Sequence, residues 1–181
     1  MTSARPWVLD TSTLTHLCRA GHTEIIEDLA PGGVVVVPSE VNDEIEQGRS
    51  IYPGIPAITS LSWVQLAVLT DEEIWTQLDV KAQMGGRPRD HLGECAVIAC
   101  ARHRGMTAIL DERAAIAQAD RLCVETHDTL WIVVEAYKTL FGRDRDKAAE
   151  VVDALLRTGM RLPVDSGESL IGWAYGELLL P

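Results

Sequence analysis

The sequence lacks the features of membrane proteins, secreted proteins and small zinc-bound domains. No apolar run is long enough to cross a bilayer as a helix, and no basic segment followed by an apolar signal region opens the chain. The four cysteines stand apart without a Cys-x-x-Cys pair, which favours buried reduced thiols over a zinc site or disulfides. We therefore expect a cytoplasmic protein without a membrane partner.

Basic side chains are scarce in the first part of the chain. Residues 1–80 carry 3 basic and 12 acidic side chains, residues 81–161 carry 13 and 12, and residues 162–181 carry none and 3. The formal net charge of −11 argues against a surface that holds nucleic acid by its field alone. A polyanion would approach over the second part of the chain. The arginines there, each of which also fits an ordinary solvated face, are Arg87, Arg89, Arg102, Arg104, Arg113 and Arg121.

The chain has neither an internal repeat nor a low-complexity segment, and its 181 residues suffice for one domain with a sizeable core. Apolar runs at 7–9, 34–37 and 107–110 predict strands buried in a parallel sheet. Residues 95–101 are apolar on every side, so this helix must be covered on both flanks. Strands alternating with helices predict an α/β fold.

Weaker patterns complete the prediction. They are an edge strand at 63–68, a strand at 122–124, a helix that Ser39 caps, and helices at 71–84, 113–119, 129–140, 145–158 and 167–179. The whole pattern predicts a three-layer α/β/α domain with a central parallel sheet over residues 1–140. Residues 141–181 are predicted to form a helical extension packed on the same domain.

Two carboxylates lie at the ends of predicted strands. Asp10 follows the strand at 7–9, and Asp111 follows the strand at 107–110. The carboxyl ends of parallel strands form the usual binding crevice of open α/β sheets. Other roles stay open for both residues: Asp10 also fits a helix cap, and Asp111 also fits an ion pair with Arg113 or Arg104.

Two further carboxylates lie at the borders of apolar helix faces. Glu44 lies in angle between Val41 and Ile45, and Glu94 is in the first turn of the apolar helix. Glu44 also fits a solvated helix position, and Glu94 also fits a residue that complements the helix dipole. Glu112 is predicted to face solvent. His91, His103 and His127 lack a ligand spacing, so no histidine is proposed as a metal ligand.

Four converging carboxylates would repel one another and would need protons or hard cations between them. Oxygen ligands of this kind suit Mg²⁺ or Mn²⁺, which also bridge phosphate oxygens. Such ions activate water and stabilise the leaving oxygen of a phosphodiester. The residue pattern therefore favours metal-dependent phosphodiester hydrolysis.

Four segments together resemble the PIN-domain nucleases, and most of all a bacterial branch with a Gly-Glu third motif. The segments are Val8-Leu9-Asp10-Thr11-Ser12, Val37-Pro38-Ser39-Glu40-Val41-Asn42-Asp43-Glu44-Ile45, Gly93-Glu94-Cys95-Ala96-Val97-Ile98-Ala99 and Leu110-Asp111-Glu112-Arg113. The resemblance covers about residues 6–140. It implies a PIN-like fold and an Mg²⁺- or Mn²⁺-dependent endoribonuclease similar to the toxins of toxin-antitoxin pairs, with an RNA substrate, an antitoxin partner and a homodimer.

By the same resemblance, Asp10, Glu44, Glu94 and Asp111 form the catalytic and metal-binding quartet, and the hydroxyl of Ser12 lies just behind it. Two departures stand out. Many toxin enzymes have an aspartate where this chain has Glu94. The branch often has a Gly-Thr pair where this chain has Asp128-Thr129, and the added charge would repel a phosphate backbone.

Other classes fit less well or remain open. A phosphatase that used Asp10 as nucleophile would want an acid two residues later, where Ser12 stands. A response-regulator-like domain would need a suitably placed lysine, and Lys81 lies in a helix close to a connector. The main alternative is a catalytically silent PIN-like module that binds a partner protein. Its acidic first part would suit a basic partner.

Overall fold

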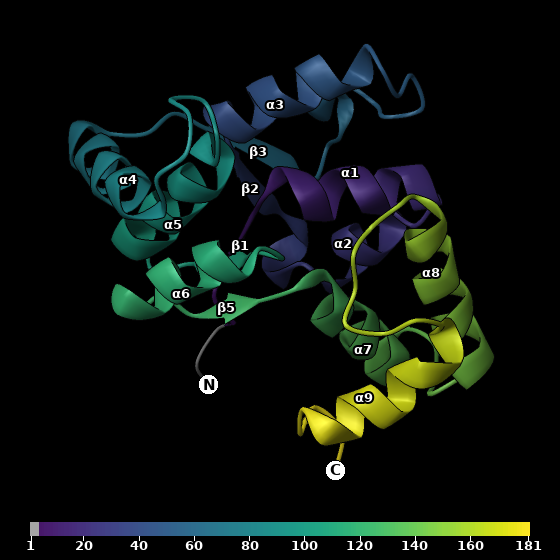
Figure 1. Cartoon of the computed structure of the whole chain (residues 1–181). Helices are drawn as coiled ribbons and strands as arrows, with labels where there is room; N and C mark the ends of the chain where they lie inside the picture. The colour runs from purple at the N-terminus through teal and green to yellow at the C-terminus, as the bar shows by residue number, and fades with distance from the viewer. Residues whose placement is uncertain (1–3) are drawn as a thin grey trace.

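The computed structural model describes residues 4–181 and contains a five-stranded parallel sheet at its centre (Figure 1). The strand order is β3-β2-β1-β4-β5. The strands are β1 (Trp7–Leu9), β2 (Val35–Pro38), β3 (Val64–Ala67), β4 (Thr107–Ile109) and β5 (Thr126–His127). Because β1 and β2 are buried along their whole length, the sheet has a fully apolar middle, as the continuous Val-rich run predicted.

Helices cover both faces of the sheet. They are α1 (Thr11–Ala20), α2 (Glu24–Leu29), α3 (Ser39–Arg49), α4 (Asp71–Met84), α5 (Leu92–Arg104), α6 (Arg113–Arg121), α7 (Thr129–Thr139), α8 (Arg145–Arg157) and α9 (Leu170–Gly176). Figure 1 shows α4, α5 and α6 on one side of the sheet and α1, α2, α7 and α8 on the other. The fold is therefore the predicted three-layer α/β/α arrangement.

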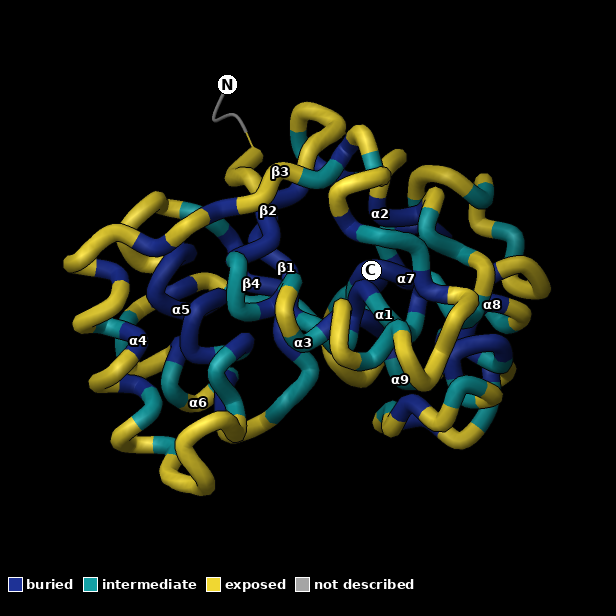
Figure 2. Tube along the Cα trace, turned by 90° about the horizontal axis from the view of Figure 1, so that it is seen from above, coloured by how far each residue is buried: buried dark blue, intermediate teal, exposed yellow. Residues whose placement is uncertain are grey.

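Helix α5 is more buried than α4 and α6, which lie on the same side of the sheet. Every residue from Cys95 to Ala101 is buried, and the helix packs on β1, β2 and β4 on one side and on α4 on the other. Figure 2 shows β1, β2 and α5 as largely buried chain inside an exposed periphery. Gly105 ends α5 in the left-handed conformation (φ 65°), which glycine adopts without steric cost. The next strand, β4, then starts beside β1.

The C-terminal part packs on the same body. Helix α8 contacts α1 and α7, and α9 contacts α8. The backbone N–H of Gly167 donates to Asp153 of α8 (2.7 Å). At Gly167 an added Cβ would lie 2.1 Å from the carbonyl oxygen of Ala149, so only glycine fits this close approach. The division of the chain at residue 140 stays a prediction.

Two local predictions were wrong. Residues 122–124 form a helix end and turn, with Cys123 exposed at φ 55°, and the strand comes later as β5. A short apolar run does not by itself distinguish a strand from a helix end. Ser39 is the first residue of α3 and not its cap, since the cap position is Pro38. Asp10 caps α1, so the helix-cap role that its position also fitted is observed.

The edge position of β3 is confirmed, and the other three cysteines are at least half-buried free thiols. Among residues 4–181, each helix is too short or too polar to span a bilayer.

Candidate active site

Asp10 and Asp111 stand at the carboxyl ends of two neighbouring strands. Strands β1 and β4 pair in parallel with Leu9 opposite Ile109, and the backbone N–H of Asp10 donates to the carbonyl oxygen of Ile109 (3.3 Å). Asp10 is only 2% exposed, and Asp111 is half-buried. Sheet pairing therefore brings together two carboxylates that lie about a hundred positions apart in the sequence.

Two buried threonines hold these carboxylates. The backbone N–H of Thr13 donates to Asp10 Oδ1 (2.9 Å), and the Thr13 hydroxyl lies 3.2 Å from Asp111 Oδ2. Thr129 donates its backbone N–H to Asp111 Oδ1 (2.9 Å) and its hydroxyl to Asp111 Oδ2 (2.8 Å). Both threonines are fully buried, so their donors have no competing water and fix the orientation of the aspartates. Neither was predicted from the sequence as a contact of the aspartates.

Glu44 reaches the start of α5 from α3. Its Oε2 accepts a hydrogen bond from the hydroxyl of Thr11 (2.6 Å), and its Oε1 accepts one from the backbone N–H of Gly93 (2.9 Å). A Cβ at position 93 would lie 2.7 Å from Glu44 Oε2. The glycine before Glu94 therefore leaves the space that the Glu44 carboxylate occupies.

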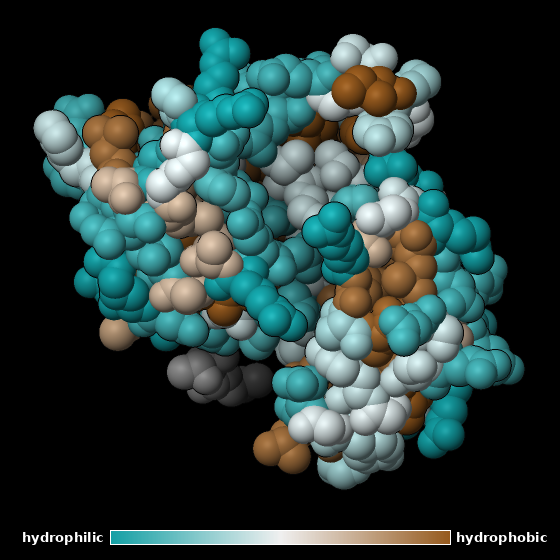
Figure 3. All heavy atoms as spheres, viewed as in Figure 1, coloured by the Kyte–Doolittle hydropathy of each residue, from teal (hydrophilic) through white to brown (hydrophobic). Residues whose placement is uncertain are grey.

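Three of the four predicted acids line one cleft of about 360 Å³. Asp10, Glu94 and Asp111 share it with Ser12, Glu112 and the segment 159–161. Glu44 lines a neighbouring hollow with Glu40, Asp43 and Arg89. Figure 3 shows a hollow with a mainly hydrophilic lining between the side that carries α4–α6 and the side that carries α8 and α9.

The acids of the site perturb one another. Burial, and then the charge of Asp111, raises the pKa of Asp10 well above its ordinary value. Burial raises the pKa of Glu94 too, and the charges of Glu44 and Glu112 add to this increase. Glu44 therefore acts electrostatically on the cleft although it lines the hollow beside it. The cluster as a whole favours protons or cations.

His91 and Glu112 join this cluster, and sequence reasoning missed both. Ligand atoms of His91, Glu94 and Glu112 lie within 4.8 Å of one another. His91 Nδ1 lies 3.0 Å from Glu112 Oε2. Glu112, which was predicted to face solvent, keeps 38% of its side chain exposed and also lines the cleft. Carboxylate oxygens in a cleft with raised carboxyl pKa values are the donor set that a hard divalent cation prefers, so the residues fit such an ion.

The alternative partners of Asp111 are not found. Arg104 instead binds Glu73 through two nitrogens (2.6 and 2.8 Å), and within residues 4–181 Arg113 makes no ion pair. One arginine lines the same cleft from outside the α/β layers: Arg161, in the segment after α8. No sequence motif pointed to Arg161, because its position depends on how α8 packs against α1.

One comparison with known proteins gives a match. A family model described as a PIN domain matches residues 6–172, which include all the acids of the cleft. No curated protein matches the chain.

Proposed function

Because this chain belongs to the PIN-domain family, a fold of metal-dependent nucleases, we propose that it is a divalent-metal-dependent endoribonuclease that hydrolyses RNA phosphodiester bonds. One observation carries the proposal: Asp10, Glu94 and Asp111 come from distant parts of the chain and line one cleft. Burial and the neighbouring carboxylates raise the pKa values of Asp10 and Glu94. A cation bound among these carboxylates would offset their mutual repulsion.

Mg²⁺ or Mn²⁺ would be held by Asp10, Glu94 and Asp111, with Glu44 beside Glu94 as the fourth acid of the proposed quartet. Glu112 and His91 extend the same donor set. When bound, the ion would supply positive charge for activating water and for stabilising the leaving oxygen.

The chain itself supplies orientation. Thr13 and Thr129 fix the directions of both aspartates, and Thr11 and Gly93 fix that of Glu44. Arg161 lines the same cleft and would contact a phosphate oxygen of the substrate. Ser12 lines the cleft and offers a hydroxyl close to Asp10. No side chain is required as a nucleophile, because water attacks the phosphorus.

The test is RNA cleavage by purified protein with Mg²⁺ or Mn²⁺, using a pool of structured and unstructured RNAs. We expect cleavage by the wild type, none in EDTA and none by Asp10→Asn, which keeps an acceptor for the N–H of Thr13 but loses the charge. Asp28→Asn is the matched control, since Asp28 is exposed on α2. Equal cleavage by wild type and Asp10→Asn would remove the proposed site. Absence of cleavage by the wild type would favour a partner-binding module.

The toxin role, the antitoxin partner, the homodimer and the cytoplasmic location belong to the same proposal and have their support in the resemblance of the motifs. Expression of the wild type should arrest growth where Asp10→Asn does not. Light scattering of the purified protein measures whether it is a dimer. Growth unaffected by the active enzyme would remove the toxin role and leave the nuclease proposal intact.

A further inference from the structure

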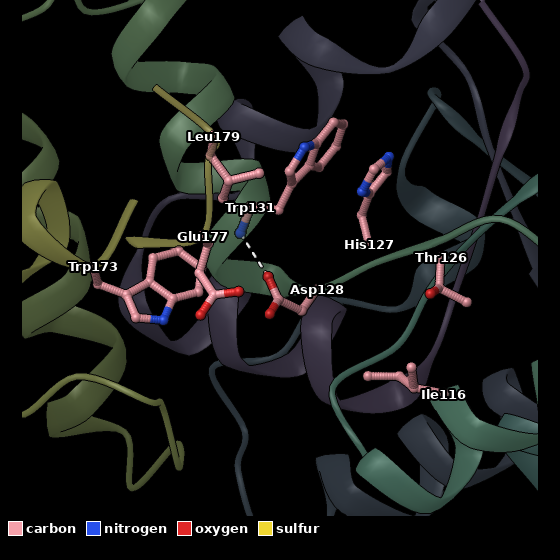
Figure 4. Close-up of a pocket in the computed structure, with 8 residues that line it drawn as sticks. All are labelled: Ile116, Thr126, His127, Asp128, Trp131, Trp173, Glu177 and Leu179. Atoms are coloured by element: carbon pink, nitrogen blue, oxygen red, sulfur yellow. Dashed lines mark hydrogen bonds between the residues drawn. The ribbon is translucent and has the colours of Figure 1, made fainter. Parts of the chain in front are cut away.

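The acidic cleft continues into a second hollow and then into a pocket. The second hollow, of about 600 Å³, shares Asp111 and Arg161 with the cleft. The pocket, of about 190 Å³, shares Ile116, Asp128, Trp173 and Glu177 with that hollow (Figure 4). A continuous depression therefore leads from the proposed site of cleavage to the C-terminal helix α9.

Arginines line the second hollow but not the pocket, whereas Asp128, Trp173 and Glu177 line both. Arg161 and Arg113 line the second hollow, and neither makes an ion pair anywhere in the described part of the chain. The pocket beyond them contains the half-buried indole of Trp173 and the carboxylates of Asp128 and Glu177. Phosphate groups fit the two arginines of the hollow and are repelled by the carboxylates of Asp128 and Glu177. An aromatic wall with acceptor-only groups suits a flat ring that carries N–H donors.

We propose that this pocket binds a guanine base of the RNA strand whose backbone lies in the acidic cleft. The inference rests on the proposed ribonuclease function and adds the base that the enzyme selects next to the cleaved bond.

Contacts within the chain hold one wall of the pocket in place. His127 stacks on Trp131 with ring centroids 3.7 Å apart and an interplanar angle of 4°. Asp128 Oδ1 accepts the backbone N–H of Trp131 (2.7 Å), which leaves Oδ2 without a partner among residues 4–181. Figure 4 shows the carboxylates of Asp128 and Glu177 pointing toward each other, with the Trp173 ring beside Glu177. The pocket therefore presents two acceptor groups next to an aromatic face.

Guanine matches these acceptors better than the other bases. Its Watson–Crick edge presents the N1–H and the amino group side by side, so that one carboxylate accepts both. Adenine and cytosine each present one amino group next to a ring acceptor. Uracil presents an N–H between two carbonyl oxygens, which would face the carboxylates. We expect guanine to bind most tightly and uracil least tightly. Stacking on Trp173 would contribute to the binding of all four bases.

The first experiment measures base binding without cleavage. Guanosine, adenosine, cytidine and uridine 5′-monophosphates are titrated into the wild-type protein in EDTA, and the indole N–H signals of the tryptophans are followed by NMR. Trp173→Phe assigns the Trp173 signal. We expect this signal to move with guanosine monophosphate, which should bind about tenfold more tightly than uridine monophosphate. An unmoved Trp173 signal, or equal affinities for the two nucleotides, would overturn the proposal.

Two variants with matched controls test the individual contacts. Trp173→Ala should lose most nucleotide binding, whereas Trp75→Ala, at a tryptophan that is 73% exposed on α4, should not change it. Glu177→Gln should reduce the preference for guanine over uracil, whereas Glu168→Gln, at an exposed position before α9, should keep it. If a variant and its control bound the nucleotides alike, the contact that the variant removes would play no part in nucleotide binding.

This assay contains neither divalent ions nor a cleavable bond, so its outcome is independent of the nuclease test. Guanine binding without any RNA cleavage would support the base pocket and remove the proposed chemistry. Cleavage that depends on Asp10 but shows no base preference would support the chemistry and overturn the pocket.

Discussion

The carboxylate of Glu44 occupies the space of the side chain that residue 93 lacks. Glu44 Oε1 accepts the backbone N–H of Gly93 at 2.9 Å, and a Cβ on that residue would lie 2.7 Å from Oε2. The first turn of α5 therefore serves two acids at once: it carries Glu94, and its backbone binds Glu44. This explains in physical terms why a glycine precedes the glutamate in this motif.

Gly93→Ala should displace Glu44 and impair RNA cleavage while the fold persists. The new methyl group pushes out the end of a flexible side chain, so the loss of its hydrogen bond should outweigh the gain in helix propensity by only about 1 kcal/mol. Denaturant unfolding and RNA cleavage measure the two effects. Gly48→Ala in α3 is the control, because an added Cβ there meets no atom within 4 Å. Unchanged cleavage by Gly93→Ala would show that the position of Glu44 does not matter.

Thr129→Val should weaken cation binding by freeing Asp111. The variant removes the hydroxyl that donates to Asp111 Oδ2 at 2.8 Å, and hydrogen bonds to charged groups contribute about 1.5–3 kcal/mol. The Mn²⁺ concentration that gives half-maximal cleavage should rise, and Thr129→Ser should restore it. Thr139→Val, at an exposed position at the end of the same helix, should leave it unchanged. The same Mn²⁺ dependence in Thr129→Val would contradict a positioning role.

Asp10→Asn should stabilise the metal-free protein at neutral pH. The pKa of Asp10 is raised in the folded state. The folded protein therefore keeps the proton on Asp10 at pH values above about 3.9, at which the unfolded chain has lost it. Stability therefore falls as the pH rises from that value through the folded-state pKa. The asparagine has no charge to bury, so its stability should exceed that of the wild type by on the order of 1 kcal/mol at pH 7 in EDTA. Unfolding curves between pH 4 and 8 measure this. A wild type more stable than the variant at pH 7 would contradict it.

Glu73→Gln should destabilise the fold without affecting the site. The Glu73 side chain is 1% exposed and binds Arg104 through two hydrogen bonds. Removing the charge of Glu73 leaves the partly buried guanidinium of Arg104 without its ionic partner, at a cost of about 3 kcal/mol. The bond to Arg104 lowers the pKa of Glu73, so this stabilisation is present above the unfolded pKa and is lost as the pH falls through the folded one. The difference in unfolding free energy between wild type and variant should therefore shrink below pH about 4. A constant difference down to pH 2 would contradict the charged pair.

The parts of the site that follow from regular structure were predictable. Asp10 and Asp111 follow apolar strands, and parallel strands end at one edge, so their convergence needs only the correct strand order. Glu94 was identified because the rest of its helix is apolar on every side. The PIN-domain family and the three-layer fold, both inferred from these motifs, are confirmed.

Other features depend on geometry that has no local sequence signal. His91 contacts Glu112 from a left-handed backbone conformation (φ 61°) that its sequence neighbours do not indicate. Arg161 lines the cleft of the acids because α8, which precedes it, packs against α1. The strand predicted at 122–124 failed because Val124 is buried next to the end of α6, which gives the apolar pattern of a strand without its pairing. Tertiary packing decided all three.

The most direct test of the account is thermal melting of wild type and Asp10→Asn during a titration with Mn²⁺. A cation held only by the folded protein stabilises it by about 2.7 kcal/mol at a hundred times its dissociation constant. The wild type should therefore melt several degrees higher as Mn²⁺ is added, with a saturating dependence, and Asp10→Asn should show little or none of this increase. An equal increase in both proteins, or none in the wild type, would contradict a divalent-cation site built on the converging acids.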